Sequence, residues 1–148
     1  MPGPDAFQPM DMLEIVSEAT MDQIEFVTEF VNTWLTGLGC SEHFLIQLDV
    51  AIDELFGNIV HYAYGSEPGP VTVRMSMEED NHVVVITFLD QGQPFNPLET
   101  VMPDFTGLSA KKRPIGGMGL FMVKKTMDGL FYEYCDGKNI LTIKKRIL

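Results

Sequence analysis

Basic residues are scarce in this sequence. Ten Lys and Arg residues stand against 21 Asp and Glu residues, so the formal net charge is −11 and the pI is about 4.5. Because non-specific nucleic-acid binding depends on a basic protein surface, this balance argues against direct binding to DNA or RNA. The acidic surface suits a basic protein partner, although net charge by itself does no more than keep a protein soluble.

Cysteine and long apolar runs are equally scarce. Cys40 and Cys135 lie far apart without CxxC spacing, which predicts a reducing, cytoplasmic compartment and two small core side chains. No apolar run approaches the roughly 20 residues that cross a bilayer, so we expect no membrane contact. The first ten residues, MPGPDAFQPM, lack the basic and apolar regions of a signal peptide and are expected to be flexible.

Several catalytic and nucleotide-binding motifs are also missing. The sequence has no GxxxxGK[ST] phosphate loop, no HRD or DFG kinase motif and no HExxH zinc motif. Gly117 and Gly119 form a GxG, but Met122 stands where a dinucleotide-binding fingerprint has its third small residue. The three histidines show no metal-ligand spacing. These absences argue against the phosphate-loop, dinucleotide-binding and zinc-protease classes.

The periodic patterns are those of one globular domain spanning residues 1–148, with 45% hydrophobic and 21% charged residues. They predict, in chain order, a strand at 12–17, helices at 20–38 and 41–64, strands at 71–77 and 83–89, a helix at 120–128, and strands at 130–135 and 140–147. Helices with mostly hairpin-joined strands predict an α/β (α+β) two-layer sandwich, in which helices cover one face of a mainly antiparallel sheet.

Local signals set the ends of several elements. Thr20 followed by Gln23 predicts a capping box at the start of the first helix, and Ser41 is a suitable cap for the second. The Asp136-Gly137 pair predicts a tight hairpin turn between the last two strands.

Glu54 and Asn58 share one polar stripe of the helix at 41–64, because residues three and four apart lie on the same side. Gly57 and Asn58 are poor helix formers, and Gly costs roughly 1 kcal/mol relative to Ala there; such local violations are often functional or strained. A carboxamide oxygen suits Mg²⁺, and a carboxylate one turn away can accept a proton. The alternative is a polar helix edge that faces water.

Two further motifs carry chemistry. Asp90 ends the strand at 83–89, where a carboxylate can accept a hydrogen bond from an exocyclic amine such as that of adenine, and Gly92 lets the backbone approach a flat ring. Gly117 and Gly119 precede a helix, where free backbone N–H groups and the helix dipole favour a phosphate. Each motif alone is also typical of a tight turn or connection.

Residues 91–116 are irregular and rich in proline. Structureless segments longer than roughly 15 residues are usually functional lids or disordered. This one carries the basic run Lys111-Lys112-Arg113 in an otherwise acidic chain. The run is either a solvated loop or a clamp for phosphates.

Taken together and in this order, the motifs resemble those of the Bergerat-fold ATPases, the superfamily of histidine kinases and type II topoisomerases. The resemblance is closest to the small anti-sigma factor serine/threonine kinases and covers about residues 10–147. The family's N-box is matched by DELFGNIVHYAYG, its D-x-G-x-P-F box by FLDQGQPFNP, its G-x-G-L box by GGMGLFMVKKTMD and its closing strand by KNILTIKK. Gln93-Pro94 stands where many superfamily members have another glycine, which favours the anti-sigma branch.

The resemblance implies a role for each matched residue. Catalysis and metal binding would fall to Glu54 as the base and Asn58 as the Mg²⁺ ligand. The nucleotide-binding residues would be Asn58, Asp90, Gly92, Lys111, Lys112, Arg113, Gly117, Gly119, Leu120 and Thr142. Within this set, Asp90 would bind the adenine amine and Thr142 a water near the adenine. Residues 91–116 would form the ATP lid.

The resemblance also implies a function: an ATP- and Mg²⁺-dependent serine/threonine protein kinase that regulates transcription as an anti-sigma factor. Such a protein binds a sigma factor and phosphorylates an anti-anti-sigma antagonist, with a homodimer as one option. One alternative is an ATP-gated binding module that sequesters a regulatory partner without phosphotransfer. Another is a simple ATPase domain whose partner uses hydrolysis for motion. The presence of Glu54 favours the kinase over the silent binder.

Overall fold

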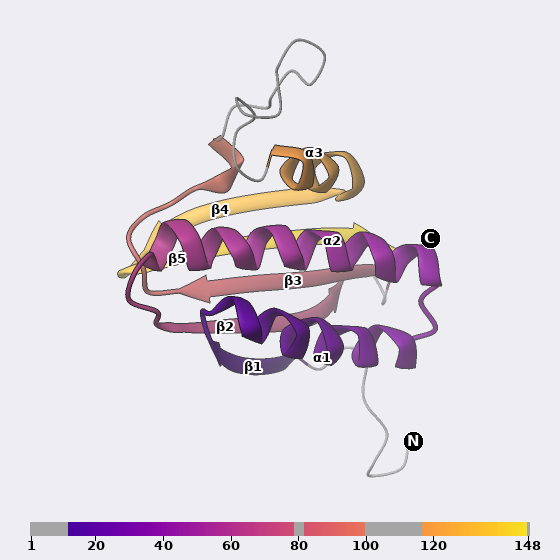
Figure 1. Ribbon diagram of the computed structural model, residues 1–148. Helices are drawn as coiled ribbons and strands as arrows, with labels where there is room; N and C mark the ends of the chain where they lie inside the picture. The colour runs from indigo at the N-terminus through magenta and orange to yellow at the C-terminus, as the bar shows by residue number, and fades with distance from the viewer. Residues whose placement is uncertain (1–11, 79–81, 100–116, 148) are drawn as a thin grey trace.

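Among the residues that the structure describes, three α-helices cover one face of a five-stranded sheet (Figure 1). The computed structural model describes residues 12–78, 82–99 and 117–147. The elements in chain order are β1 (Leu13–Glu18), η1 (Met21–Gln23), α1 (Ile24–Gly37), α2 (Glu42–Asn58), η2 (Ile59–Tyr64), β2 (Pro70–Glu78), β3 (Val83–Asp90), η3 (Pro97–Glu99), α3 (Gly117–Thr126), β4 (Gly129–Cys135) and β5 (Lys138–Arg146). The predicted order of helices and strands is confirmed.

The sheet has the strand order β1-β2-β3-β5-β4, and every neighbouring pair is antiparallel. β3 lies in the middle and is buried on both faces for most of its length, as its continuous apolar sequence predicts. Asp136 and Gly137 join β4 to β5 with φ values of 53° and 77°, the positive values that a type I′ hairpin turn requires. The two-layer sandwich with a mainly antiparallel sheet is therefore confirmed.

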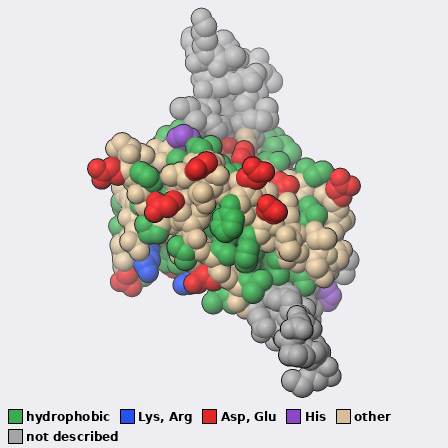
Figure 2. All heavy atoms as spheres, turned by 60° about the horizontal axis from the view of Figure 1, so that its bottom comes forward, with side chains coloured by type: hydrophobic (Ala, Val, Ile, Leu, Met, Phe, Trp, Pro, Cys, Tyr) green, Lys and Arg blue, Asp and Glu red, His purple; other side chains and the backbone are tan. Residues whose placement is uncertain are grey.

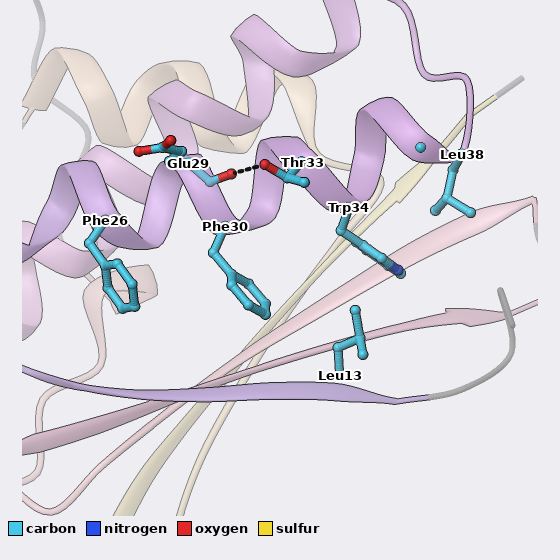
Figure 3. Close-up of a pocket in the computed structure, with 8 residues that line it drawn as sticks. Leu13, Phe26, Glu29, Phe30, Thr33, Trp34 and Leu38 are labelled. Carbon is cyan, nitrogen blue, oxygen red and sulfur yellow. Dashed lines mark hydrogen bonds between the residues drawn. The ribbon is translucent and has the colours of Figure 1, made fainter. Parts of the chain in front are cut away.

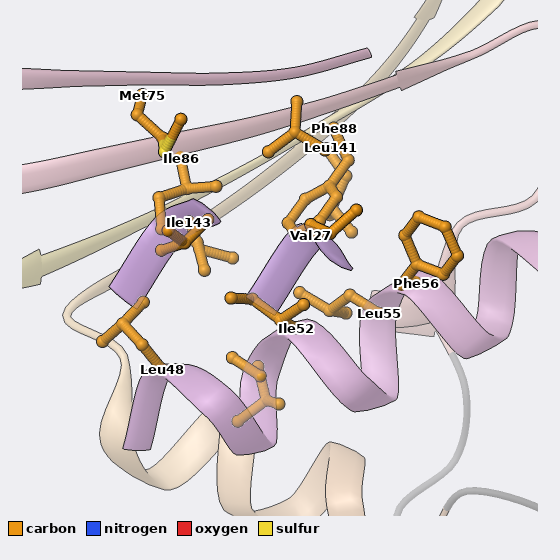
Figure 4. Packing of buried hydrophobic residues seen from close by; sticks show 14 of the residues in the cluster. Val27, Leu48, Ile52, Leu55, Phe56, Met75, Ile86, Phe88, Leu141 and Ile143 are labelled. Carbon is orange, nitrogen blue, oxygen red and sulfur yellow. The ribbon is translucent and has the colours of Figure 1, made fainter. Parts of the chain in front are cut away.

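The core lies between the sheet and the helices. α2 runs across the middle of the helical layer, with α1 packed on one side and α3 on the other. Its apolar face points at the central strands (Figure 4), and the fully buried contributors include Leu48, Ile52, Leu55, Phe56, Met75, Ile86, Phe88 and Ile143. Each such side chain contributes roughly 1.5–3 kcal/mol relative to an exposed position, so this packing fixes where the polar stripe of α2 lies.

The start of the first helix differs from the prediction. The Thr20 hydroxyl bonds the Asp22 carboxylate instead of capping a backbone N–H, and a 3-10 turn precedes α1. The side chain of Gln23 accepts a hydrogen bond from Ser17 at 3.3 Å, so the capping box is not formed. Ser41, in contrast, accepts a hydrogen bond from the backbone N–H of Phe44 at 3.1 Å, which confirms the predicted cap of α2.

The central helix continues to Tyr64, as predicted, but its last six residues form the π-helix η2. π-Helical turns often occur at functional sites. Here the Ala63 carbonyl accepts a hydrogen bond from the Gln93 backbone N–H, and the Tyr62 carbonyl accepts one from the Gln93 side chain, both at 2.8 Å. The Tyr64 hydroxyl accepts a third, from the Gln91 N–H, also at 2.8 Å. The chain that leaves β3 is thus tied to the end of the central helix.

The two cysteines occupy different environments. Cys40 is half-buried and packs against the core, whereas Cys135 is exposed at the end of the β4–β5 hairpin. The prediction of a core side chain is therefore wrong for Cys135, because it precedes the turn rather than facing the helices. Within the described ranges, no helix is both long and apolar enough to cross a membrane.

Candidate functional site

The predicted polar stripe of α2 is present, and two of its members interact. Asn58 is buried, Glu54 is half-buried, and their side chains are hydrogen-bonded one helical turn apart. Burial raises the pKa of Glu54 above its ordinary value, the bond to Asn58 opposes the rise, and the nearby charge of Asp53 adds to it. A carboxylate with a raised pKa is a stronger proton acceptor near neutral pH.

The beginning of α3 lies against Glu54. A Cβ atom on Gly119 would stand 2.0 Å from the Glu54 Oε1, so the side chain of Glu54 occupies the space that glycine leaves open. Leu120 is only 2% exposed and belongs to the core, while Gly117 is the first residue of α3. The structure therefore brings Glu54 and the GxG segment together, although the two lie more than 60 residues apart in sequence.

The basic run of the predicted lid, Lys111-Lys112-Arg113, lies outside the residues that the structure describes. Its proposed contact with phosphates remains a prediction from the sequence.

Asp90 is a buried carboxylate at the end of β3, with 3% of its surface exposed. Its Oδ1 accepts hydrogen bonds from the Asn139 amide at 2.8 Å and from the Gly92 backbone N–H at 2.9 Å. Burial raises the pKa of Asp90, and these two hydrogen bonds offset part of the rise. The carboxylate is thus held in one orientation at the edge of the space between α2 and the sheet.

Asn139 is a site residue that the sequence analysis missed. Its amide donates to Asp90 and to the Gln93 carbonyl, both at 2.8 Å, and its oxygen accepts from the Phe95 N–H at 3.0 Å and from the Tyr132 hydroxyl. These four bonds use the full capacity of the side chain. Buried and less buried residues alternate along β5, and this alternation places Asn139 on the buried face. The sequence analysis missed it because it predicted that the strand begins at residue 140, after Asn139.

Thr142 does not lie where the prediction put it. Asn139 pairs with Asp90 across β3 and β5, and three residues further along a strand the side chain points to the opposite face. Thr142 instead contacts Thr87 at 3.2 Å on the face without helices. From this face Thr142 would not hold the expected water near the adenine, because the carboxylate proposed to bind the adenine amine faces the helices. Asn139 is the residue of β5 beside that carboxylate.

Gly92 is required by packing against the π-helix. An added Cβ would stand 2.4 Å from the Ala63 carbonyl oxygen and 2.5 Å from its carbon, closer than side-chain atoms approach a backbone. The close approach is what allows Gln93 to bond Ala63. The steric reason for this glycine is thus the neighbouring backbone, and its place beside a flat ring remains a prediction.

Gly92→Ala is expected to lower the free energy of unfolding by about 2–3 kcal/mol, because the backbone must shift and the Gln93–Ala63 bond is lost. Gly57→Ala is the matched control. A Cβ there would meet nothing within 4 Å, and Ala is the better helix former by about 1 kcal/mol. Urea unfolding of both variants checks this contrast, and equal changes in the two would contradict the steric explanation.

The space between α2, β3 and β5 is almost closed. The cavity beside Asn58, Asp90 and Asn139 has a volume of about 10 Å³ and is walled by Phe95 and Tyr132, whereas ligand pockets usually measure roughly 300–1,000 Å³. Phe95 stacks on Tyr62, with ring centroids 5.0 Å apart.

The polar groups around this space fit an adenine nucleotide with Mg²⁺. Asp90 offers a carboxylate for the adenine amine, Asn58 offers a carboxamide oxygen for the metal, and the start of α3 offers backbone N–H groups for the phosphates.

Comparison with known proteins gives a consistent picture. The sequence pattern of the histidine kinase-like ATPase domain matches residues 17–145. The serine-protein kinase RsbW of Listeria innocua is 32% identical over 111 residues, which span 72% of this chain and 69% of that protein. The serine/threonine-protein kinase BtrW of Bordetella bronchiseptica is 29% identical over 97 residues, 65% of this chain and 66% of that protein.

Two solved structures have the same fold. One contains the RsbU and RsbW domains of Rv1364c from Mycobacterium tuberculosis, with a TM-score of 0.64 and 20% identity over 94% of this chain and 33% of that one. The other is the SiaB–SiaC complex from Pseudomonas aeruginosa, with a TM-score of 0.53 and 19% identity over 90% of this chain and 88% of that one. At these identities the likeness concerns the fold alone.

Proposed function

Because the chain belongs to the histidine kinase-like ATPase family, with serine-protein kinases among its relatives, we propose that it is an ATP- and Mg²⁺-dependent serine/threonine protein kinase. One observation carries the proposal: Glu54, a carboxylate with a raised pKa, touches both Asn58 and the glycine-rich start of α3. In the proposed function this cluster supplies the proton acceptor, the metal ligand and the helix start that binds phosphates.

Each residue of the cluster has a distinct task. The Glu54 carboxylate orients a serine or threonine hydroxyl of the protein substrate and accepts its proton. The Asn58 oxygen would hold Mg²⁺, which would neutralise charge on the phosphates. Asp90, held by Asn139, accepts a hydrogen bond from the adenine amine. Phosphoryl transfer depends mainly on positioning and charge neutralisation, so this small set of groups is sufficient.

We further propose that the kinase acts as an anti-sigma factor. In this role the protein binds and silences a sigma factor, and it phosphorylates an anti-anti-sigma antagonist that competes for it. The support is the similarity to RsbW and BtrW, together with motifs of the anti-sigma branch.

Affinity capture from the native host, followed by mass spectrometry, identifies both partners. Labelled ATP added to the purified captured antagonist then tests transfer, and an unlabelled antagonist with wild-type protein would reject the kinase in favour of the silent binding module.

Asn58→Ala is expected to weaken the Mg²⁺ dependence of ATP binding more than the binding of the base. The variant removes the oxygen proposed as the metal ligand and leaves Asp90 and Asn139 in place. Asn58 is 8% exposed and bonded to Glu54, so a loss of stability of roughly 1 kcal/mol is expected as well. Calorimetric titration of ATP with and without Mg²⁺ measures the effect, and an unchanged Mg²⁺ dependence would exclude Asn58 as the ligand.

A further inference from the structure

A hydrogen-bond network beside Asp90 contains a tyrosine that the proposed reaction does not use. Tyr132 on β4 donates a hydrogen bond from its hydroxyl to the side-chain oxygen of Asn139, a residue of β5 with 3% of its surface exposed. In the β4–β5 register, Tyr132 pairs with Leu141, a member of the core. Leu141 and Asn139 are two residues apart on β5, so all three side chains lie on the face that the helices cover. Tyr132 is thus connected to Asp90 through Asn139.

The four hydrogen bonds of Asn139 permit one orientation of its amide group. The oxygen accepts from the Tyr132 hydroxyl and from the Phe95 N–H at 3.0 Å, whereas the NH₂ group donates to Asp90 Oδ1 and to the Gln93 carbonyl, both at 2.8 Å. A rotation of the amide by 180° would set its oxygen against two acceptors and its NH₂ group against the Phe95 N–H. Because buried polar groups without partners are costly, the amide keeps its donor toward the carboxylate.

The orientation of this amide decides which oxygen of Asp90 is open to a ligand. Oδ1 accepts from Asn139 and from the Gly92 N–H at 2.9 Å, so Oδ2 is the oxygen for the adenine amine in the proposed function. An ionised carboxylate can only accept hydrogen bonds. It therefore suits the amine of adenine and repels the carbonyl oxygen that hypoxanthine and guanine carry at the same ring position. The preference for adenine depends on how firmly Asp90 is held.

Tyr132 is suited to hold the amide because its hydroxyl remains a donor. Burial raises the pKa of Tyr132 above its ordinary value of 10.0, so the hydroxyl keeps its proton at neutral pH. As a donor it adds a second hydrogen bond on the oxygen side of the Asn139 amide, beside that of Phe95.

We propose that Tyr132 is a positioning residue that acts through Asn139 to hold Asp90 in the orientation that prefers adenine to 6-oxopurines. This inference rests on the proposed nucleotide-binding function, because it concerns the base that the same site would bind. It adds to that function a residue of β4, the edge strand beyond β5.

Calorimetric titration of the intact protein with ATP and with inosine triphosphate, both with Mg²⁺, tests the proposal. Tyr132→Phe removes the hydroxyl and keeps the ring. It is expected to weaken ATP about fivefold, the value of one net hydrogen bond, and to weaken inosine triphosphate less, because that base gains nothing from a fixed Asp90. The control is Tyr134→Phe, at a tyrosine two residues along β4 that is 45% exposed, and it should leave both affinities unchanged.

A double-mutant cycle tests whether Tyr132 acts through Asn139. Asn139→Ala removes the bond to the carboxylate itself and is expected to weaken ATP about tenfold or more. Adding Tyr132→Phe to this variant should cause no further loss, since the group that it holds is already absent. Full additivity of the two losses would overturn the proposed route through Asn139.

Trp34 shows whether each variant is folded. It is the only tryptophan of the chain, and in Figure 3 it points from α1 toward Leu13 of β1. Figure 2 shows this face, where acidic side chains surround a hydrophobic patch. β1 and β4 are opposite edges of the sheet, so the substitutions leave the surroundings of Trp34 intact and its emission measures unfolding alone. In nucleotide-free protein, NMR should show several-fold faster hydrogen exchange of the Asn139 side-chain amide in Tyr132→Phe than in Tyr134→Phe.

The outcomes separate this inference from the function on which it rests. If the wild type binds ATP, the inference is overturned by equal affinity for the two nucleotides, by an equal loss of both in Tyr132→Phe, or by an effect no larger than that of Tyr134→Phe. In each of these cases the proposed function stands. A wild type that binds neither nucleotide would reject both. A lower ratio of ATP to inosine triphosphate affinity in Tyr132→Phe alone, with faster exchange of the Asn139 amide, is the expected result.

Discussion

Glu54→Gln is expected to reduce phosphoryl transfer about 10²–10⁴-fold, the usual effect of removing a general base, while ATP–Mg²⁺ binds with nearly unchanged affinity. Gln keeps the size of the side chain and can still bond Asn58, but it has no basic oxygen. The half-buried position of Glu54 raises its pKa and makes it a better proton acceptor than an exposed glutamate. A glutamate that merely solvates the helix edge would leave both quantities unchanged.

The measurement compares wild type, Glu54→Gln and the control Glu42→Gln, which alters an exposed glutamate at the start of the same helix. Transfer from labelled ATP to the purified antagonist gives the rate, and calorimetry gives the affinity. Gly119→Ala adds an independent check, because its Cβ would displace the Glu54 carboxylate without removing it. We expect about a tenfold loss of transfer from this misplacement. Full transfer by Glu54→Gln would show that another group is the base.

Asp90→Asn is expected to weaken ATP and ADP binding about 10²-fold. Affinity falls strongly when a protein group that should accept a hydrogen bond from the ligand is replaced by one that cannot. The two hydrogen bonds described for Asp90, from Asn139 and Gly92, both end on Oδ1. An asparagine oxygen can keep both, which leaves its NH₂ group at the second oxygen position. A donor there faces the donor of the adenine amine, so binding suffers while the local structure persists.

The same variant is expected to be at least as stable as wild type at neutral pH. Burial raises the pKa of Asp90 above its ordinary value of 3.8, so the folded protein holds this proton to higher pH than the unfolded chain. The contribution of this carboxyl to the free energy of unfolding is fully present at pH values below 3.8. It is lost as the pH rises through the pKa of the folded state. Urea unfolding across this range should show wild type losing stability relative to Asp90→Asn as the pH rises. Lower stability of the variant together with unchanged nucleotide affinity would contradict both expectations.

The order of the elements and the antiparallel sheet were predictable because they depend on local periodicity. The Ser41 cap and the Asp136-Gly137 turn likewise depend on a few neighbouring residues. The pairing of Glu54 with Asn58 followed from helical spacing alone. These are the features for which local sequence and tertiary structure agree.

The remaining parts of the site depend on contacts between distant segments. The role of Asn139 rests on the register of β5 against β3, and a strand start misplaced by two residues hid it. Thr142 was misplaced because the face of a strand changes with every residue. The need for Gly92 comes from the Ala63 carbonyl of the π-helix, 29 residues earlier, and the sequence carried no sign that the helix would widen there.

The central claim is that this site binds ATP with Mg²⁺, and isothermal titration of the wild-type protein tests it most directly. We predict heat of binding for ATP in the presence of Mg²⁺, weaker binding when Mg²⁺ is removed, and weaker binding again for Asp90→Asn. Absence of ATP binding to the wild type with Mg²⁺ present would contradict the account.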